Sequence, residues 1–339
     1  MSAHEMETTV KALTAPGKGI LAADESTGTI EKRFKGVDAP CTEDTRREYR
    51  EMLFTTPGLG EFISGVILFE ETLGQKNAAG VPLPQLLAEQ GIIPGIKVDK
   101  GTVALPGFPG EKVTQGLDGL AERLVEYKKS GARFAKWRAM LAIGAGIPSL
   151  QGIAANAEAL ARYAAICQEQ GLVPIVEPEV LMDGDHAIET CARVTEEVLH
   201  TVFHALHRHR VVLEFMLLKP NMVLPGLACP RQATPEAVAE ATLACLRRTV
   251  PAAVPGIHFL SGGQQDEIAT ANLNAMNTRL GNTPWQLSFS YARALQAPAL
   301  KAWRGVAANK SAGQQALYKR ARLNGAASRG QYTVIMEQN

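Results

Sequence analysis

A lysine stands at the end of an apolar run near the middle of the chain. Residues 215–218 are bulky and apolar and Lys219 follows them, which is typical of a short buried strand with a charged end. Pro220 cannot donate to a sheet ladder, so we expect the strand to end there. Burial removes water from an amine, which lowers its pKa and makes it a better nucleophile. Lys219 is therefore a candidate nucleophile, although a lone lysine at a strand end usually reaches solvent.

Two other segments alternate between apolar and charged residues. The alternation places Lys136 and Arg138 on one face of RFAKWRAM (133–140), and Glu177 with Glu179 on one face of LVPIVEPEV (172–180). A lysine beside Lys219 would lower the pKa of its amine further. Other predicted strands also end in polar residues, namely Asp24, Glu70, Lys97, Ser261 and Arg293. Cations and carboxylates in one site suit an anionic substrate whose reaction needs proton transfers.

Two groups of residues could bind anions. Ser261, Gly262 and Gly263 present successive backbone N–H groups after the seventh predicted strand, and Arg293 follows the eighth. This combination matches the phosphate site that is common in parallel eight-stranded barrels. The second group follows the first and third predicted strands and consists of Ser26, Thr29, Arg33 and Lys97.

Eight apolar segments alternate with helical ones, which predicts an α/β fold with a parallel sheet and helical crossovers. We expect a (β/α)8 TIM barrel at about 19–303 in a single domain of residues 1–339, with an N-terminal helix, a C-terminal tail at about 304–339 and no β-hairpin. A helix is expected to begin at an Asn156 cap. An open doubly wound sheet is the alternative, but the GxGxxG turn that usually marks it is missing. In such a barrel the carboxyl ends of the strands meet on one face, where active sites lie.

Composition excludes several classes of partner. The 339 residues include 35 basic and 34 acidic side chains, so the net charge of +1 provides no field to attract nucleic acid or anionic membranes. The N-terminus has no apolar signal core. Five cysteines without a CxxC pair indicate reduced thiols in the cytoplasm, where we expect the protein to act.

Seven segments, in this order between residues 19 and 303, closely resemble the class I fructose-bisphosphate aldolases: GILAADEST, GIKVDKG, RFAKWR, PIVEPE, LLKPNMV, FLSGGQ and LSFSYARALQAPALKAW. The resemblance implies a (β/α)8 barrel without metal or cofactor, and a homotetramer. It also implies reversible cleavage of fructose 1,6-bisphosphate into dihydroxyacetone phosphate and glyceraldehyde 3-phosphate, in glycolysis and gluconeogenesis.

The resemblance also assigns roles. It implies that Lys219 forms a Schiff base with the substrate ketone, that Glu177 is acid and base during its formation and that Glu179 supports Glu177. Asp24 would take the C4 hydroxyl proton, and Lys136 would stabilise charge nearby. The implied substrate contacts are Ser261, Gly262, Gly263, Ala292 and Arg293 at the 1-phosphate, Ser26, Thr29, Arg33 and Lys97 at the 6-phosphate, and Arg138.

The chain departs from the family pattern at three places. Ala292 stands where vertebrate members have glycine, which should be tolerated if its φ is negative. Thr29 replaces a serine and keeps the hydroxyl. The C-terminus stops short of the tyrosine that protonates the enamine in vertebrate enzymes, and Tyr332 does not match that position. We therefore expect water, a carboxylate or Tyr332 to take this role.

Other functions remain open from the sequence. His200 and His204 have the i, i+4 spacing of a zinc-binding pair, but they precede the sixth strand on a helix expected at the outside of the barrel. A pyridoxal-phosphate enzyme also needs a lysine imine and a phosphate site, and would be coloured. An aldolase for another ketose phosphate and a non-catalytic scaffold are the remaining alternatives.

Overall fold

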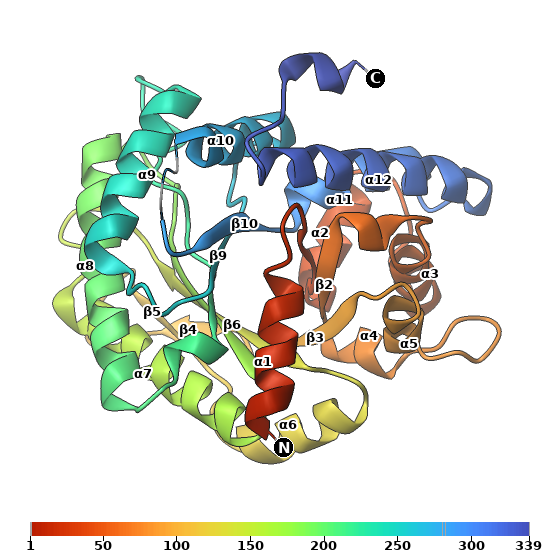
Figure 1. Cartoon of the computed structure of the whole chain (residues 1–339), viewed down its shortest axis with the longest axis horizontal. Coiled ribbons are helices and arrows are strands. Elements are labelled where there is room, and N and C mark those ends of the chain that lie inside the picture. The colour runs from red at the N-terminus through yellow and green to blue at the C-terminus, as the bar shows by residue number, and fades with distance from the viewer. Residues whose placement is uncertain (1, 280, 282, 339) are drawn as a thin grey trace.

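Eight parallel strands close into a barrel in the computed structural model, which describes residues 2–279, 281 and 283–338 (Figure 1). Around the barrel the order is β1-β10-β9-β8-β7-β6-β3-β2. The strands are β1 (Gly19–Ala23), β2 (Ile63–Leu68), β3 (Ile93–Lys97), β6 (Phe134–Leu141), β7 (Val173–Val180), β8 (Leu217–Leu218), β9 (Gly256–Phe259) and β10 (Gln286–Tyr291). The predicted barrel is confirmed.

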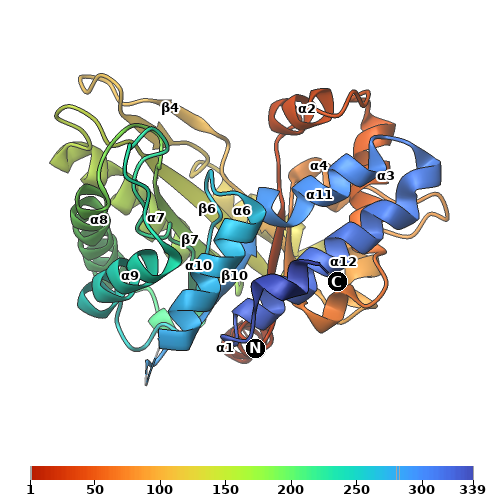
Figure 2. The ribbon, with the colours of Figure 1, turned by 90° about the horizontal axis from the view of Figure 1, so that it is seen from above.

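Helices surround the barrel on its outside, as Figures 1 and 2 show. Those between the strands are α2 (Thr27–Lys35), α3 (Glu43–Phe54), α4 (Glu70–Gly74), α5 (Leu83–Ala88), α6 (Leu120–Lys129), α7 (Leu150–Glu169), α8 (Ile188–Arg208), α9 (Pro235–Thr249) and α10 (Asp266–Arg279). The chain begins with α1 (Ser2–Leu13) and ends with α11 (Arg293–Trp303), α12 (Lys310–Ala327) and the 3-10 turn η4 (Val334–Glu337).

A buried apolar cluster that includes Ile20, Phe134 and Leu217 lies inside the barrel, away from the carboxyl ends of its strands. Phe134 fills much of this space, and Gly65 and Gly95 make room for it, because a Cβ at either glycine would lie within 3.1 Å of its ring. Met6 and Val10 of α1 belong to the same buried cluster as Phe134, so α1 covers the end opposite the strands' carboxyl ends.

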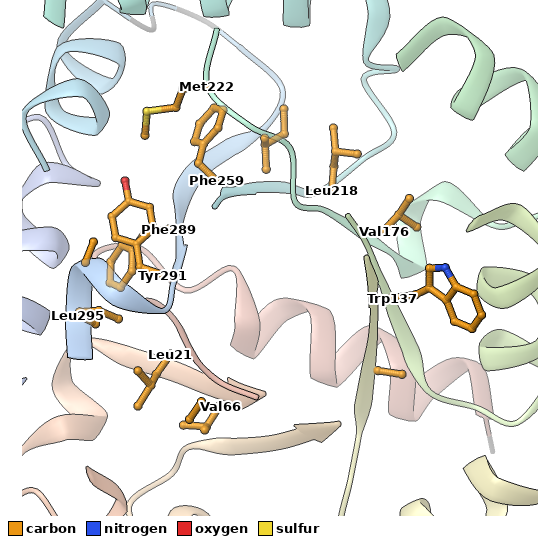
Figure 3. Close-up of a cluster of buried hydrophobic side chains, with 14 of the residues drawn as sticks. Leu21, Val66, Trp137, Val176, Leu218, Met222, Phe259, Phe289, Tyr291 and Leu295 are labelled. Carbon is orange, nitrogen blue, oxygen red and sulfur yellow. The ribbon is translucent and has the colours of Figure 1, made fainter. Parts of the chain in front are cut away.

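A second apolar layer separates the strands from the helices. Successive side chains of a strand point to opposite faces, so Trp137, Val176 and Leu218 point outward into this layer, as Figure 3 shows. Their neighbours Lys136, Glu177 and Lys219 then point into the barrel. Burial of the outward layer thus holds the three charged residues in register.

Two features of the fold differ from the sequence prediction. β4 (Thr102–Ala104) and β5 (Lys112–Thr114) form an antiparallel hairpin outside the barrel, so the prediction of no hairpin is wrong. All three residues of β4 are exposed. The segment therefore does not need the apolar pattern by which a buried strand is recognised in a sequence. Asn156 is not a cap either, because Ser149 caps α7 and Asn156 lies buried inside the helix.

Candidate active site

A cavity of about 580 Å³ opens at the carboxyl ends of the barrel strands. With the exception of Gly263, every residue that the sequence predicts for the catalytic and substrate-binding groups lines it. Glu70 does not line this cavity. It follows the end of β2 by two residues, as predicted, but it begins α4 and pairs with Lys100 and Tyr127. Its expected place among the residues that meet in the cavity is therefore wrong.

A chain of ion pairs occupies the floor of the cavity. Nζ of Lys219 lies 3.0 Å from Oε1 of Glu177, and Nζ of Lys136 lies 3.0 Å from Oε2 of the same carboxylate. Lys136 also lies 2.6 Å from Oδ2 of Asp24. All four residues are buried. Glu177 therefore joins the candidate nucleophile to the second lysine, and Lys136 joins the two carboxylates.

These pairs keep Asp24, Glu177 and Lys136 charged despite burial. Burial raises the pKa of Asp24, but the attraction of Lys136 and Lys219 outweighs it and holds the pKa well below its usual value. The pKa of Glu177 is lowered by the same balance. Burial lowers the pKa of Lys136, but Asp24 and Glu177 raise it above its usual value. At neutral pH the two carboxylates are thus bases that can each accept a proton.

Another ion pair lies two residues further along β6 and β7, toward the carboxyl ends of these strands. Arg138 pairs with Glu179 through Nε and Oε2, and the backbone register places Arg138 beside Glu177. Both side chains face the cavity, as the alternation predicts. Glu179 therefore fixes the arginine above Glu177, where its guanidinium can reach a substrate oxygen.

The loop after β9 and the start of α11 form one anion-binding candidate. Arg293 donates to the backbone oxygen of Gly262, and Gly262 has a φ of +55° that favours glycine. Ala292 has a φ of −101°, so a Cβ is tolerated there as expected. Gly263 instead points its N–H at Sδ of Met182, 3.1 Å away. Met182 follows β7 in a loop and no sequence pattern marked it.

The other candidate anion site surrounds the start of α2. Ser26 precedes this helix without capping it through its side chain, and its Oγ lies 3.1 Å from Oγ1 of Thr29. The first two N–H groups of α2 are therefore open to an anion, whereas the N–H of Thr29 donates to the backbone oxygen of Ser26 over 2.9 Å. Arg33 donates to Glu25, and Nζ of Lys97 donates to Oδ1 of Asp99 over 2.6 Å.

Glu25 and Asp99 are functional candidates that the sequence analysis missed. Each lies close in sequence to a predicted site residue, Glu25 directly after Asp24 and Asp99 two residues after Lys97. Both are buried and line the cavity. The sequence signal that could have identified both residues is a carboxylate within two residues of a predicted strand end.

The cations around the cavity are only partly neutralised by these carboxylates. Burial lowers the pKa of Arg293, and repulsion from Arg33 lowers it further. Arginines that repel one another across a cavity favour an anion between them. The cavity therefore suits an anionic substrate.

The possible metal ligands His200 and His204 are exposed on α8. Within residues 2–279, 281 and 283–338, no group of three or more His, Cys, Asp or Glu side chains could hold a metal ion. None of the helices in the same ranges has the length and hydropathy needed to span a bilayer.

Comparison with known proteins decides the family. The sequence model described as Fructose-bisphosphate aldolase class-I matches residues 5–339. The chain belongs to the class I fructose-bisphosphate aldolases. The resemblance of its strand ends to this family is thereby confirmed.

Individual members of the family are similar over nearly the whole chain. A probable class 1 fructose-bisphosphate aldolase of Xanthomonas campestris is 59% identical, over 98% of this chain and 99% of its own. The cytosolic fructose-bisphosphate aldolase 5 of Arabidopsis thaliana is 58% identical, over 98% and 92%. The fructose-bisphosphate aldolase of Plasmodium falciparum, solved with TRAP and a small-molecule inhibitor, superposes with a TM-score of 0.96 at 55% identity, over 98% and 96% of the two chains.

Proposed function

We propose that Lys219, Glu177, Lys136 and Asp24 carry out the aldol cleavage of fructose 1,6-bisphosphate, the reaction of the class I family to which the chain belongs. The observation that supports these roles is the contact of Glu177 with both lysines at 3.0 Å. One carboxylate can then take a proton from the attacking amine while the other lysine stays charged.

Schiff-base formation comes first. The amine of Lys219 attacks the ketone carbon C2, and Glu177 accepts the proton that the nitrogen loses and passes it to the C2 oxygen, which gives a neutral carbinolamine. Glu177 then transfers a second proton, taken up from water, to the C2 hydroxyl, which leaves as water and gives the protonated imine. This sequence requires Glu177 to start as a base, in agreement with its lowered pKa.

Cleavage follows on the covalent intermediate. Asp24 takes the C4 hydroxyl proton, the C3–C4 bond breaks and glyceraldehyde 3-phosphate leaves. The bonding electrons move into the protonated imine, which becomes an enamine. Lys136 holds Asp24 at 2.6 Å, so its positive charge stays beside the reacting oxygen. Protonation and hydrolysis of the enamine then release dihydroxyacetone phosphate.

The two anion sites orient this substrate. Ser261, Gly262 and Arg293 bind the 1-phosphate with Gly263 and Ala292, and Arg138 contacts the sugar. The 6-phosphate lies at the start of α2, with Ser26, Thr29, Arg33 and Lys97 around it. Repulsion between Arg33 and Arg293 supports a bound anion in the part of the cavity between them.

Borohydride reduction tests these assignments. Substrate and borohydride should leave a covalent adduct on the peptide that contains residue 219, and mass spectrometry should locate it. Lys219→Met should abolish the adduct and lower kcat by about 10⁴-fold or more. Lys100→Met is a matched control, because Lys100 is exposed and pairs with Glu70 outside the cavity. An adduct that persists in Lys219→Met would refute the assignment.

We also propose a single-domain homotetramer located in the cytoplasm. The relatives named cytosolic in Arabidopsis thaliana support the location. Light scattering of the purified protein tests the tetramer, and a mass of one or two chains would refute it. Activity that survives EDTA and a colourless protein would agree with an aldolase that needs neither metal nor pyridoxal phosphate.

A further inference from the structure

Glu25 contacts side chains from three different helices. Arg33 of α2 donates to its Oε1, Gln296 of α11 donates to the same oxygen over 2.8 Å, and Nη2 of Arg50 in α3 lies 2.5 Å from Oε2. These three helices lie on the same side of the barrel (Figure 2). The side chain of Glu25 is 2% exposed, so its orientation is set by these contacts.

The charges of this cluster do not cancel. Burial raises the pKa of Glu25, but Arg50 and Arg33 outweigh it and hold the pKa below its usual value, so the carboxylate stays ionised. One carboxylate then faces two arginines. The side chain of Arg50 is 3% exposed, whereas that of Arg33 is 20% exposed and lines the cavity. The uncompensated positive charge is thus presented to the cavity by Arg33.

The cluster is also rigid. Gln296 donates through Nε2 to the backbone oxygen of Ala22 over 2.6 Å, and its Oε1 accepts from Tyr49 over 3.2 Å. Glu25 lies in the short connection between β1 and α2. Gln296 links its side chain to the backbone of β1 at Ala22. Arg33 uses one of its five N–H groups on Glu25, which leaves the others for a ligand.

We propose that Glu25 is a positioning residue for the 6-phosphate of the substrate, and that it acts by holding the guanidinium of Arg33 at the cavity wall. This inference rests on the proposed function, because it needs the phosphate at α2. An arginine fork that is already oriented loses less freedom when it binds a phosphate. Without Glu25, Arg33 would turn toward solvent and bind the phosphate less well.

Two substrates separate this role from a general loss of structure. Fructose 1,6-bisphosphate carries the 6-phosphate and fructose 1-phosphate lacks it. Glu25→Asp keeps the negative charge beside Arg50 but is one methylene too short to keep all three contacts. We expect its KM for the bisphosphate to rise about tenfold, while kcat/KM for fructose 1-phosphate changes less than about twofold. Glu31→Asp, at an exposed position of α2, is the matched control.

A double-mutant cycle with Arg33 tests whether Glu25 acts through it. Arg33→Ala should raise the KM for the bisphosphate, and adding Glu25→Asp to that variant should raise it no further. Additive effects, an equal loss on both substrates or an unchanged KM would overturn the proposal. Glu25→Gln measured in the same way repeats the test should Glu25→Asp fold poorly. Failure of the wild-type protein to cleave either sugar would instead refute the proposed function.

Discussion

The backbone N–H of Gly263 donates a hydrogen bond to Sδ of Met182 over 3.1 Å. Gly263 belongs to the loop proposed for the 1-phosphate, yet it does not line the cavity. A thioether is a weak acceptor, whereas a phosphate oxygen is a strong one. Phosphate binding at Gly263 therefore requires this N–H to leave Met182.

Replacing Met182 should consequently strengthen phosphate binding. Met182→Leu keeps the volume but removes the competing acceptor, so the dissociation constant of dihydroxyacetone phosphate should fall. The gain is limited to the value of one neutral hydrogen bond, about 0.5–1.5 kcal/mol or roughly 2- to 10-fold. Calorimetry measures it. Met222→Leu is the control, because Met222 accepts from the side chain of Gln264 rather than from the loop backbone. Weaker binding in Met182→Leu would contradict this prediction.

Lys136→Met should alter the pH dependence of the reaction. Without this cation the burial of Asp24 and Glu177 is no longer offset as strongly, so the pKa of both carboxyl groups rises. The acid limb of kcat/KM should therefore move to higher pH, and the rate should fall by about 10²- to 10⁴-fold. Lys136→Arg keeps the charge and should move the limb less. Equal acid limbs in Lys136→Met and wild type would refute the prediction.

Stability should fall steeply in acid. Asp24, Glu25 and Glu177 have folded pKa values below their usual range, so their stabilising effect is complete above the unfolded pKa of about 4. It is lost as the pH falls from there through the lowered folded values, with a slope of up to about 4 kcal/mol per pH unit for three groups. Urea unfolding between pH 7 and pH 3 measures this slope. Glu25→Gln should reduce it by about 1.4 kcal/mol per pH unit, and an unchanged slope would contradict the role of Glu25.

The period of two in β6 and β7 predicted part of the buried cluster of charged residues. It placed Lys136 with Arg138 and Glu177 with Glu179 on the inner face, because outward residues such as Trp137 must be buried under helices. A local pattern of this kind does not depend on distant parts of the chain. It therefore survives in the folded structure.

Contacts between segments far apart in sequence could not be predicted in this way. Met182 reaches Gly263 across 81 residues, and Gln296 reaches Glu25 across 271. Lys219 was predicted to follow a short strand at residues 215–218, but β8 has two residues and a 3-10 turn (Leu213–Phe215) precedes it. The ladder nevertheless extends to Lys219, whose N–H donates to Val176 over 2.8 Å.

Tyr332 should not be the group that protonates the enamine. Its hydroxyl lies 3.1 Å from Oε1 of Glu337, its backbone N–H donates to Asn274, and it does not line the cavity. Burial and Glu337 raise the pKa of Tyr332 to about 12, which makes its phenol a weaker acid than usual. We therefore expect water or a carboxylate of the cavity to be the route of the proton.

Tyr332→Phe distinguishes these routes. Tritium exchange into dihydroxyacetone phosphate should stay within about twofold of the wild-type rate, while stability falls by about 1 kcal/mol for the lost hydrogen bond. Glu337→Gln removes the charge that faces the phenol and is the matched variant, with exchange again unchanged. A loss of exchange of tenfold or more in Tyr332→Phe, with cleavage of the C3–C4 bond intact, would place the phenol on the proton route. The η4 turn would then have to leave α12, since Glu337 also pairs with Arg320 at 2.6 Å.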